Sequence, residues 1–307
     1  MTKWMTVVGL LALGVATTSE ASATGMRPTR YLRNNGVRLA VYESGGREGP
    51  GILLVHGNTS AASSFGAFMA TPFARRHRVV AVDLPGYGNS DNAASYNVQT
   101  FTDQIAYVAN ATRTADGVIV GWSLGGDLAL QTAPRLPRAR GYFLFGTAPL
   151  GYTPGLPAPF LTPAESYAGA AVNYGFVGAL TPAQIDDYVT AFFRPGYRWI
   201  PRSFYEAGQR TDPATRTAVG IAGAGLDPTF QDEVAIARNL TVPIELVAGT
   251  KDAFVNPDYL DALAPSLPTL HDGDITYVRG AGHAIQWEDP LRFTALLADF
   301  VGDSRCD

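Results

Sequence analysis

The sequence is poor in cysteine, in lysine and in charge, and each shortage excludes a class of protein. The single cysteine, Cys306, stands next to the last residue, so the chain offers no internal disulfide, no thiolate metal cluster and no core thiol nucleophile. Lys3 and Lys251 are the only lysines, and the 23 basic residues form no extended block that could follow a phosphate backbone. With a net charge of −4, nucleic acid is not an expected partner.

The sequence also lacks an apolar run of the roughly 20 residues that a membrane-spanning helix requires. The run from Trp4 to Ala16 is followed by a polar stretch and by Ala21-Ser22-Ala23, the small-residue pattern that signal peptidases accept. We therefore predict a signal peptide over residues 1–23, cleaved after Ala23, and export to the periplasm or the medium. The alternative, a membrane anchor, needs a longer run, so no stable anchor is expected after cleavage.

What the chain does have is enough apolar residues for a large core, because 46% are hydrophobic and only 16% are charged. Short β-branched runs alternate with longer stretches of helical periodicity, which is the pattern of parallel strands joined by crossover helices. The expected fold class is therefore α/β. The expected strands span Arg38–Glu43, Ile52–His56, Arg78–Asp83, Gly117–Trp122, Tyr142–Phe145, Ile244–Ala248 and Ile275–Val278.

The alternation stops between Thr147 and Asn239, a stretch that opens with the proline-rich Ala148–Pro163 and contains no convincing buried strand. Prolines and glycines interrupt it, so we predict short helices rather than a bundle, lying over the carboxyl edge of the sheet. The predicted domains are a core of residues 24–146 and 240–307 and a cap insertion of residues 147–239.

The strongest chemical signal is Gly121-Trp122-Ser123-Leu124-Gly125-Gly126, which follows an apolar strand and precedes a helix. This is the context of a G-x-S-x-G nucleophile elbow, a turn so tight that only glycine-sized residues fit two positions before and after the serine. The turn projects the serine Oγ above the sheet at a helix N-terminus, where developing negative charge is stabilised. Ser123 is therefore the predicted nucleophile.

A serine nucleophile needs a base, and four histidines are available. His77 stands in a basic tip and His271 in a polar loop, so both are expected to be solvated. His56 ends a strand and is expected to brace the loop that follows it. His283 follows the last strand in a glycine-rich loop that can bring its ring over the serine, and we predict it to be the base.

The third member of a triad is a carboxylate that orients the imidazole, and Asp252 follows the strand before the one that leads to His283. Asp127 and Asp83 are closer to the serine in sequence but are expected to point to other parts of the fold. Lys251 is adjacent and is a competing partner for Asp252.

Acyl transfer also needs N–H groups aimed at the oxyanion. The residue after the serine, Leu124, and Asn58 in the loop after an early strand are predicted to supply them.

Together with the loop His56-Gly57-Asn58 and the segment from Asp83 to Ser90, these residues make the chain resemble the α/β-hydrolase superfamily over nearly all its mature length. The resemblance implies a mostly parallel sheet flanked by helices, a helical cap and hydrolysis through an acyl-enzyme. A serine at position 123 excludes the haloalkane dehalogenase and epoxide hydrolase branches, which place an aspartate there. No cofactor is expected, and no metal, because no cluster with ligand spacing stands outside the triad.

A narrower resemblance is to the bacterial N-acyl-homoserine lactonases of this fold. They share a His-Gly-Asn-x-Ser loop, a Gly-Trp-Ser-Leu-Gly-Gly elbow and a strand that ends near Gly-Thr-x-Pro, which stand here at 56–60, 121–126 and 146–149. The resemblance implies a lactone contact at Tyr188 in the cap, and Trp122 beside the serine is the second expected substrate contact. Two features of this chain depart from that family. The family uses a glutamate where Asp252 stands, and its members are cytoplasmic, whereas this chain has a predicted signal peptide.

Two classes of function are therefore considered. The first is a metal-independent serine hydrolase of small-molecule esters or lactones, with an acyl-homoserine lactonase and a general secreted carboxylesterase as alternatives and a perhydrolase or carbon-carbon bond hydrolase as more remote ones. The second is a non-catalytic module that binds a small apolar ligand. The joint presence of Ser123, Asp252 and His283 favours the enzyme.

Overall fold

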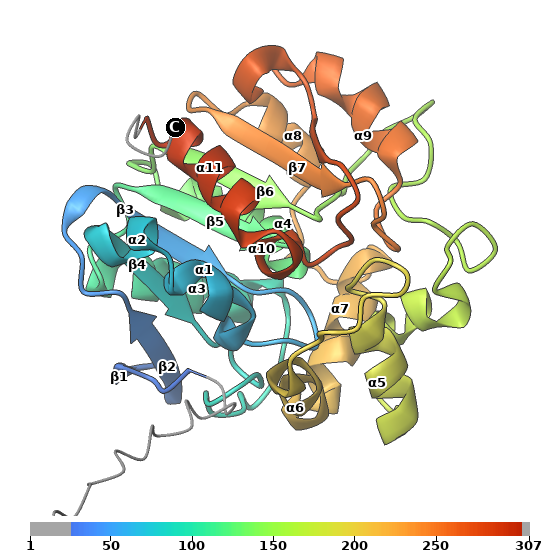
Figure 1. Ribbon diagram of the computed structural model, residues 1–307, viewed down its shortest axis with the longest axis horizontal. Coiled ribbons are helices and arrows are strands. Elements are labelled where there is room, and N and C mark those ends of the chain that lie inside the picture. Colours follow the sequence, from blue (N-terminus) through green and yellow to red (C-terminus); the bar gives the residue numbers. More distant parts are fainter. Residues whose placement is uncertain (1–25, 303–307) are drawn as a thin grey trace, which may run out of the picture.

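The computed structural model describes residues 26–302, which form an eight-stranded sheet with helices on both of its faces (Figure 1). The strand order is β1-β2-β4-β3-β5-β6-β7-β8; β1 and β4 pair with β2 antiparallel, and all other neighbours are parallel. The predicted α/β class is confirmed, whereas the predicted signal peptide and Cys306 lie outside the described residues. The strands are Arg30–Asn34 (β1), Val37–Glu43 (β2), Glu48–Val55 (β3), His77–Val82 (β4), Val118–Trp122 (β5), Gly141–Phe145 (β6), Ile244–Gly249 (β7) and Thr276–Val278 (β8).

The edge strand β1 was not predicted from the sequence. It joins β2 through a two-residue turn, with Asn34 opposite Val37. The turn residues Asn35 and Gly36 have φ values of 48° and 80°, and this hairpin turn requires positive φ at both positions. The Asn-Gly pair in front of a β-rich run is the sequence signal that would have predicted the hairpin.

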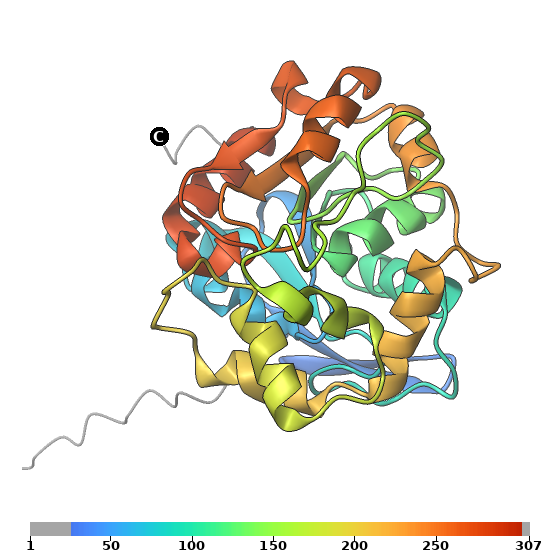
Figure 2. The ribbon, with the colours of Figure 1, turned by 90° about the vertical axis from the view of Figure 1, so that its right-hand side faces the viewer.

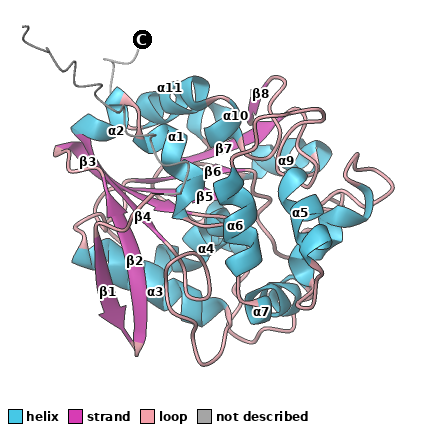
Figure 3. Cartoon of the chain, turned by 60° about the horizontal axis from the view of Figure 1, so that its bottom comes forward, coloured by secondary structure: helices cyan, strands magenta, loops and turns pink. Residues whose placement is uncertain are grey.

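Two apolar clusters cover the two faces of the sheet, because side chains alternate along each strand. In β5, Ile119 points into one cluster, and Val118 and Val120 point into the other. Helices α3, α4, α8 and α9 close the first cluster, and α1, α2, α10 and α11 close the second; Figure 3 shows α3 and α4 across the strands from α1, α2 and α11. These helices are Gly66–Met69 (α1), Pro72–Arg76 (α2), Val98–Ala111 (α3), Leu124–Thr132 (α4), Glu233–Arg238 (α8), Pro257–Leu263 (α9), Ile285–Glu288 (α10) and Pro290–Phe300 (α11).

Residues 147–239, here called the cap segment, are all described and contain short helices but no strand. The 3-10 helix η3 (Gly169–Phe176) and helices α5 (Pro182–Thr190), α6 (Arg202–Arg210) and α7 (Pro213–Gly223) lie together beyond the ends of the strands (Figure 2). Proline stands at the start of α5 and α7, where its missing N–H costs no hydrogen bond. The last helix of the segment, α8, packs against α4.

The cap segment is fastened to the loop that follows β7. The Leu161 N–H donates to the Phe254 carbonyl at 2.8 Å, and the Asn256 N–H donates to the Pro159 carbonyl at 3.0 Å. The Ser166 hydroxyl adds a third bond, to the Ala253 carbonyl at 2.7 Å. Across residues 26–302, no helix combines the length and apolar character of a membrane span.

Candidate active site

Ser123 occupies the turn between β5 and α4 with φ 53° and ψ −127°, a combination that non-glycine residues rarely adopt. Its N–H donates to the Phe145 carbonyl of the neighbouring strand at 3.0 Å, which fixes the turn on the sheet. A Cβ on Gly121 would collide with the Gly125 carbonyl oxygen, and a Cβ on Gly125 would collide with that of Val55. Strand and helix therefore approach as closely as the elbow motif predicts, and only glycine fits at these two positions.

Asp252 and His283 come from the loops after β7 and β8, which are neighbouring strands. The Asp252 Oδ2 lies 2.7 Å from the His283 Nδ1, and the two side chains are only 3% and 2% exposed. The other oxygen, Oδ1, accepts the N–H groups of Phe254 at 2.8 Å and Val255 at 3.2 Å. Lys251 is exposed and, among the described residues, forms no ion pair with Asp252.

Ser123 and His283 line one cavity between the carboxyl ends of the strands and the cap segment. Gly146, after β6, lies against the imidazole, since a Cβ there would be 3.0 Å from the His283 Cε1. The structure thus brings together the three residues predicted from sequence as a triad, two of them in hydrogen-bond contact. Apolar side chains form much of the remaining wall: Ala148, Phe160, Leu161, Val172, Phe176 and Val219 from the cap segment, and Phe254 after β7.

Asn58 and Leu124, the predicted oxyanion donors, line this cavity beside Ser123. Within the part of the chain that the structure describes, neither backbone N–H donates to a protein acceptor, so both are available to a ligand. The Asn58 side chain is held in place: its Nδ2 donates to the Gly175 carbonyl at 2.6 Å, and its Oδ1 accepts the Tyr87 hydroxyl at 3.0 Å.

Two buried residues hold the loops around Asn58. His56 Nδ1 lies 2.8 Å from the Gly57 carbonyl, and its Nε2 accepts the Leu84 N–H at 3.1 Å. Burial lowers the pKa of His56, so the ring is neutral, donates from Nδ1 and braces this loop. Asp83 accepts the Tyr42 hydroxyl and the N–H groups of Ala62 and Asn89, each at 2.7 Å.

Comparison with known proteins decides the family, since residues 52–296 match the alpha/beta hydrolase family. The chain belongs to that family. A polyketide synthase from Burkholderia thailandensis, ThaQ, is 31% identical over 249 residues, which is 78% of this chain but only 11% of the synthase. The 2-hydroxymuconate semialdehyde hydrolase of Pseudomonas sp. strain CF600 is 26% identical over 283 residues, covering 88% of this chain and 92% of that enzyme.

Among solved structures, the N-acyl homoserine lactonase AidH, complexed with N-butanoyl homoserine, superposes with a TM-score of 0.79 and 28% identity. The superposition covers 90% of this chain and 96% of AidH. The predicted α/β-hydrolase fold is therefore confirmed, and the family and its relatives support a hydrolytic function on a small molecule.

Trp122 does not lie where a substrate contact was expected in this alpha/beta hydrolase. Its side chain is fully buried and does not line the cavity, because alternation along β5 turns it into the cluster below the site. Its indole N–H donates to the His283 carbonyl at 2.9 Å. Trp122 thus supports the loop that carries His283 instead of touching substrate.

Tyr188, the other expected substrate contact, does line the cavity. Its hydroxyl lies against Gly175, which also accepts the Asn58 side chain. Burial raises the pKa of this hydroxyl above its ordinary value, so it is a neutral group at physiological pH.

Two further expectations from the sequence were wrong. Asp127 lines the same cavity as Ser123 rather than pointing elsewhere, because α4 begins at Leu124 and one turn returns the chain to that side.

His77 is 1% exposed rather than solvated: its ring stacks on Phe73 with centroids 4.0 Å apart, and Nδ1 lies 2.9 Å from the Phe73 carbonyl. The neighbouring arginines suggested an exposed turn, but they do not determine which side of β4 the His77 ring faces.

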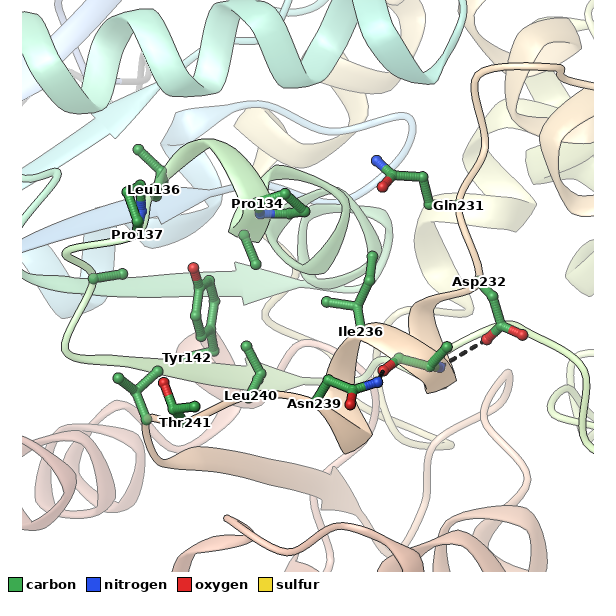
Figure 4. Close-up of a pocket in the computed structure, with 14 residues that line it drawn as sticks. Pro134, Leu136, Pro137, Tyr142, Gln231, Asp232, Ile236, Asn239, Leu240 and Thr241 are labelled. Carbon is green, nitrogen blue, oxygen red and sulfur yellow. Dashed lines mark hydrogen bonds between the residues drawn. The ribbon is translucent and has the colours of Figure 1, made fainter.

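A second cavity lies at the opposite end of the sheet, near the start of β6, where Figure 4 shows Tyr142 and Leu240 in its wall. Its one acidic residue, Asp232, is already engaged. Oδ1 accepts the Ala235 N–H at 2.8 Å, which caps α8, and Oδ2 accepts the Tyr152 N–H at 3.0 Å. The cavity at Ser123 is therefore the candidate active site.

The buried His56 gives a testable prediction. A His56→Ala variant leaves the Leu84 N–H and the Gly57 carbonyl without partners, so the free energy of unfolding should fall by about 1–3 kcal/mol. Urea denaturation followed by circular dichroism measures it. A loss under about 0.5 kcal/mol would mean that the ring does not brace the loop.

Proposed function

We propose that the protein is a serine hydrolase that cleaves carboxylic esters or lactones through an acyl-enzyme. One observation carries the proposal: His283, which is hydrogen-bonded to Asp252, lines the same cavity as Ser123, and Ser123 is held in a strained elbow. Because the Asp252 carboxylate accepts a hydrogen bond from His283 Nδ1, the proton of the neutral imidazole is on Nδ1. The His283 Nε2 is then free to accept a proton.

In the first half-reaction, the Ser123 Oγ attacks the substrate carbonyl carbon while the His283 Nε2 takes the hydroxyl proton. The carbonyl oxygen becomes an oxyanion, which the N–H groups of Asn58 and Leu124 stabilise. As the tetrahedral intermediate collapses, His283 returns the proton to the leaving oxygen. In a lactone this oxygen remains attached to the acyl group through the opened ring.

In the second half-reaction, water attacks the acyl carbon and His283 takes its proton. Collapse of the second tetrahedral intermediate breaks the bond to the Ser123 Oγ, and the proton passes to that oxygen. The products are a carboxylic acid and an alcohol, or a hydroxy acid from a lactone, and the enzyme returns to its first state. Asp252 accepts the Nδ1–H of His283 and stabilises the imidazolium formed in each half.

We infer that the substrate is a lactone with an apolar tail, such as an N-acyl-homoserine lactone. The apolar cavity wall can take an acyl chain, at about 0.8 kcal/mol per buried CH₂. The Tyr188 hydroxyl stands on the cap side of the cavity as a group that can orient the ring. Similarity to AidH over 90% of the chain favours a lactone over a linear ester.

The proposal predicts that medium-chain acyl-homoserine lactones have a higher kcat/KM than p-nitrophenyl esters of matched acyl length. Tyr188→Phe should lower kcat/KM for lactones about tenfold, the scale of one lost hydrogen bond. Tyr205→Phe is the matched control, because Tyr205 belongs to the cap segment but does not line the cavity. A panel of lactones and esters with purified protein measures both effects.

The outcomes separate the alternatives. A preference for linear esters, or an unchanged lactone rate in Tyr188→Phe, would favour a general carboxylesterase. No labelling by a fluorophosphonate serine probe would favour a non-catalytic binder.

We also propose that the protein acts outside the cytoplasm. This proposal rests only on the signal-peptide pattern of residues 1–23.

A further inference from the structure

The cavity wall contains a carboxyl group that the proposed mechanism does not use. Asp127 lies in the first turn of α4, and its N–H donates to the Ser123 carbonyl oxygen at 3.3 Å. Its side chain lines the cavity together with Ser123 and His283. Ser123 and Asp127 lie about one helical turn apart along the chain and line the same cavity, so a substrate bound at the Ser123 Oγ shares that cavity with this carboxyl.

The Asp127 carboxyl has no partner in the protein over residues 26–302. Its Oδ1 is shut off from solvent and meets no hydrogen-bond donor, and its other oxygen is likewise unbonded. The neighbouring acid Glu233 is satisfied, because its two oxygens accept the Gln131 Nε2 at 3.0 Å and the Leu150 N–H at 2.7 Å. A role in folding alone leaves the unpaired state of Asp127 unexplained, since buried polar groups nearly always have partners.

The environment keeps this carboxyl neutral. Burial raises the pKa of Asp127 well above its ordinary value, and the nearby Glu233 carboxyl on α8, whose own pKa burial raises to about 8, adds to this rise. A protonated carboxyl both donates and accepts a hydrogen bond. It therefore complements a ligand group that also donates and accepts a hydrogen bond, such as an amide.

We propose that Asp127 is a specificity-determining residue that hydrogen-bonds an amide on the carbon next to the scissile carbonyl. The enzyme would then prefer α-acylamino lactones and esters over plain alkyl ones. The amide nitrogen of such a substrate is two bonds from the carbonyl carbon, within the span between the Ser123 and Asp127 side chains. This inference rests on the proposed hydrolysis at Ser123.

The test compares two matched substrate pairs. The first is N-octanoyl homoserine lactone and an α-alkyl-γ-butyrolactone in which two methylenes replace the amide. The second is the ethyl ester of N-octanoylglycine and that of a fatty acid of equal length, which keeps the test open if no lactone is cleaved. For each pair, the ratio of kcat/KM between the amide and the alkyl substrate is measured.

Asp127→Leu should lower this ratio about tenfold, whereas Asp127→Asn, which keeps a donor and an acceptor, should stay within about threefold of wild type. Glu233→Gln is the control, because Glu233 adjoins the carboxyl without lining the cavity, and burial, the larger cause of the raised Asp127 pKa, is still present in this variant. It should leave the ratio unchanged. Asp127→Ala replaces Asp127→Leu if the leucine variant does not fold.

A ratio that Asp127→Leu or Asp127→Ala leaves unchanged, or that Glu233→Gln lowers equally, overturns the inference. So does a wild-type enzyme that cleaves the alkyl member of each pair as fast as the amide. Labelling of wild type by a fluorophosphonate probe separates the two proposals. If Ser123 is labelled and the ratio does not change, only the role of Asp127 fails, and if it is not labelled, the proposed function fails.

Discussion

A Ser123→Ala variant is expected to lose about a million-fold in kcat, the scale typical of a removed serine nucleophile. Without the Oγ the proposed acyl-enzyme cannot form, and the predicted oxyanion donors at Asn58 and Leu124 would retain only a small part of the catalysis. The protein should still fold with a melting temperature close to that of wild type, because alanine fills the same space. Hydrolysis of a p-nitrophenyl ester and thermal denaturation measure the two effects.

Ser95→Ala, an exposed loop position outside the cavity wall, is the matched control and should be fully active. Retention of a tenth of the wild-type rate in Ser123→Ala would contradict the assignment of the nucleophile. Ser123→Gly adds a second comparison at the same position. Glycine adopts φ 53° and ψ −127° more readily, so this variant should melt above Ser123→Ala if the elbow stores about 1–3 kcal/mol of strain.

Asp252→Asn is expected to lower kcat about ten-thousand-fold, as the corresponding change does in other serine triads. The local geometry supplies the reason. The N–H groups of Phe254 and Val255 both require an acceptor, so the asparagine carbonyl takes the place of Oδ1 and its NH₂ group faces His283. The imidazole must then accept at Nδ1 and carry its proton on Nε2, where it cannot take the serine proton.

Lys251→Ala is the control for this experiment, because Lys251 is adjacent in sequence but exposed, and it should leave kcat unchanged. Steady-state kinetics with an ester substrate, together with the melting temperature, show whether a loss is catalytic. A loss under a hundredfold in a well-folded Asp252→Asn variant would mean that another group orients the imidazole.

The order Ser123, Asp252, His283 could be predicted from sequence because each residue follows a recognisable strand, and the carboxyl ends of parallel strands meet at one edge. The structure brings them to that edge, while their roles in catalysis stay a prediction. The elbow glycines were equally predictable, since the steric demand of the turn is local. Strand β1 was predictable in principle from Asn35-Gly36, whose turn chemistry is also local.

The errors concern the direction of side chains. Trp122 was expected in the cavity because it adjoins Ser123, but neighbouring positions on a strand face opposite sides of the sheet. Asp127 was expected to point away, but its direction depends on the residue at which α4 begins. The walls from the cap segment and from Phe254 have no local pattern, because they exist only once distant segments pack together.

The bonds between residues 159–166 and the loop 253–256 have a consequence for exchanging caps between relatives. Phe254 carries one of these bonds on its carbonyl, while its N–H holds the Asp252 carboxylate. The cap segment and the predicted triad are therefore not separable modules. In a chimera whose foreign cap begins at residue 147, the residues that contact the loop after Asp252 would change together with the pocket. If the foreign cap begins after Ser166, the native hydrogen bonds to this loop would be kept.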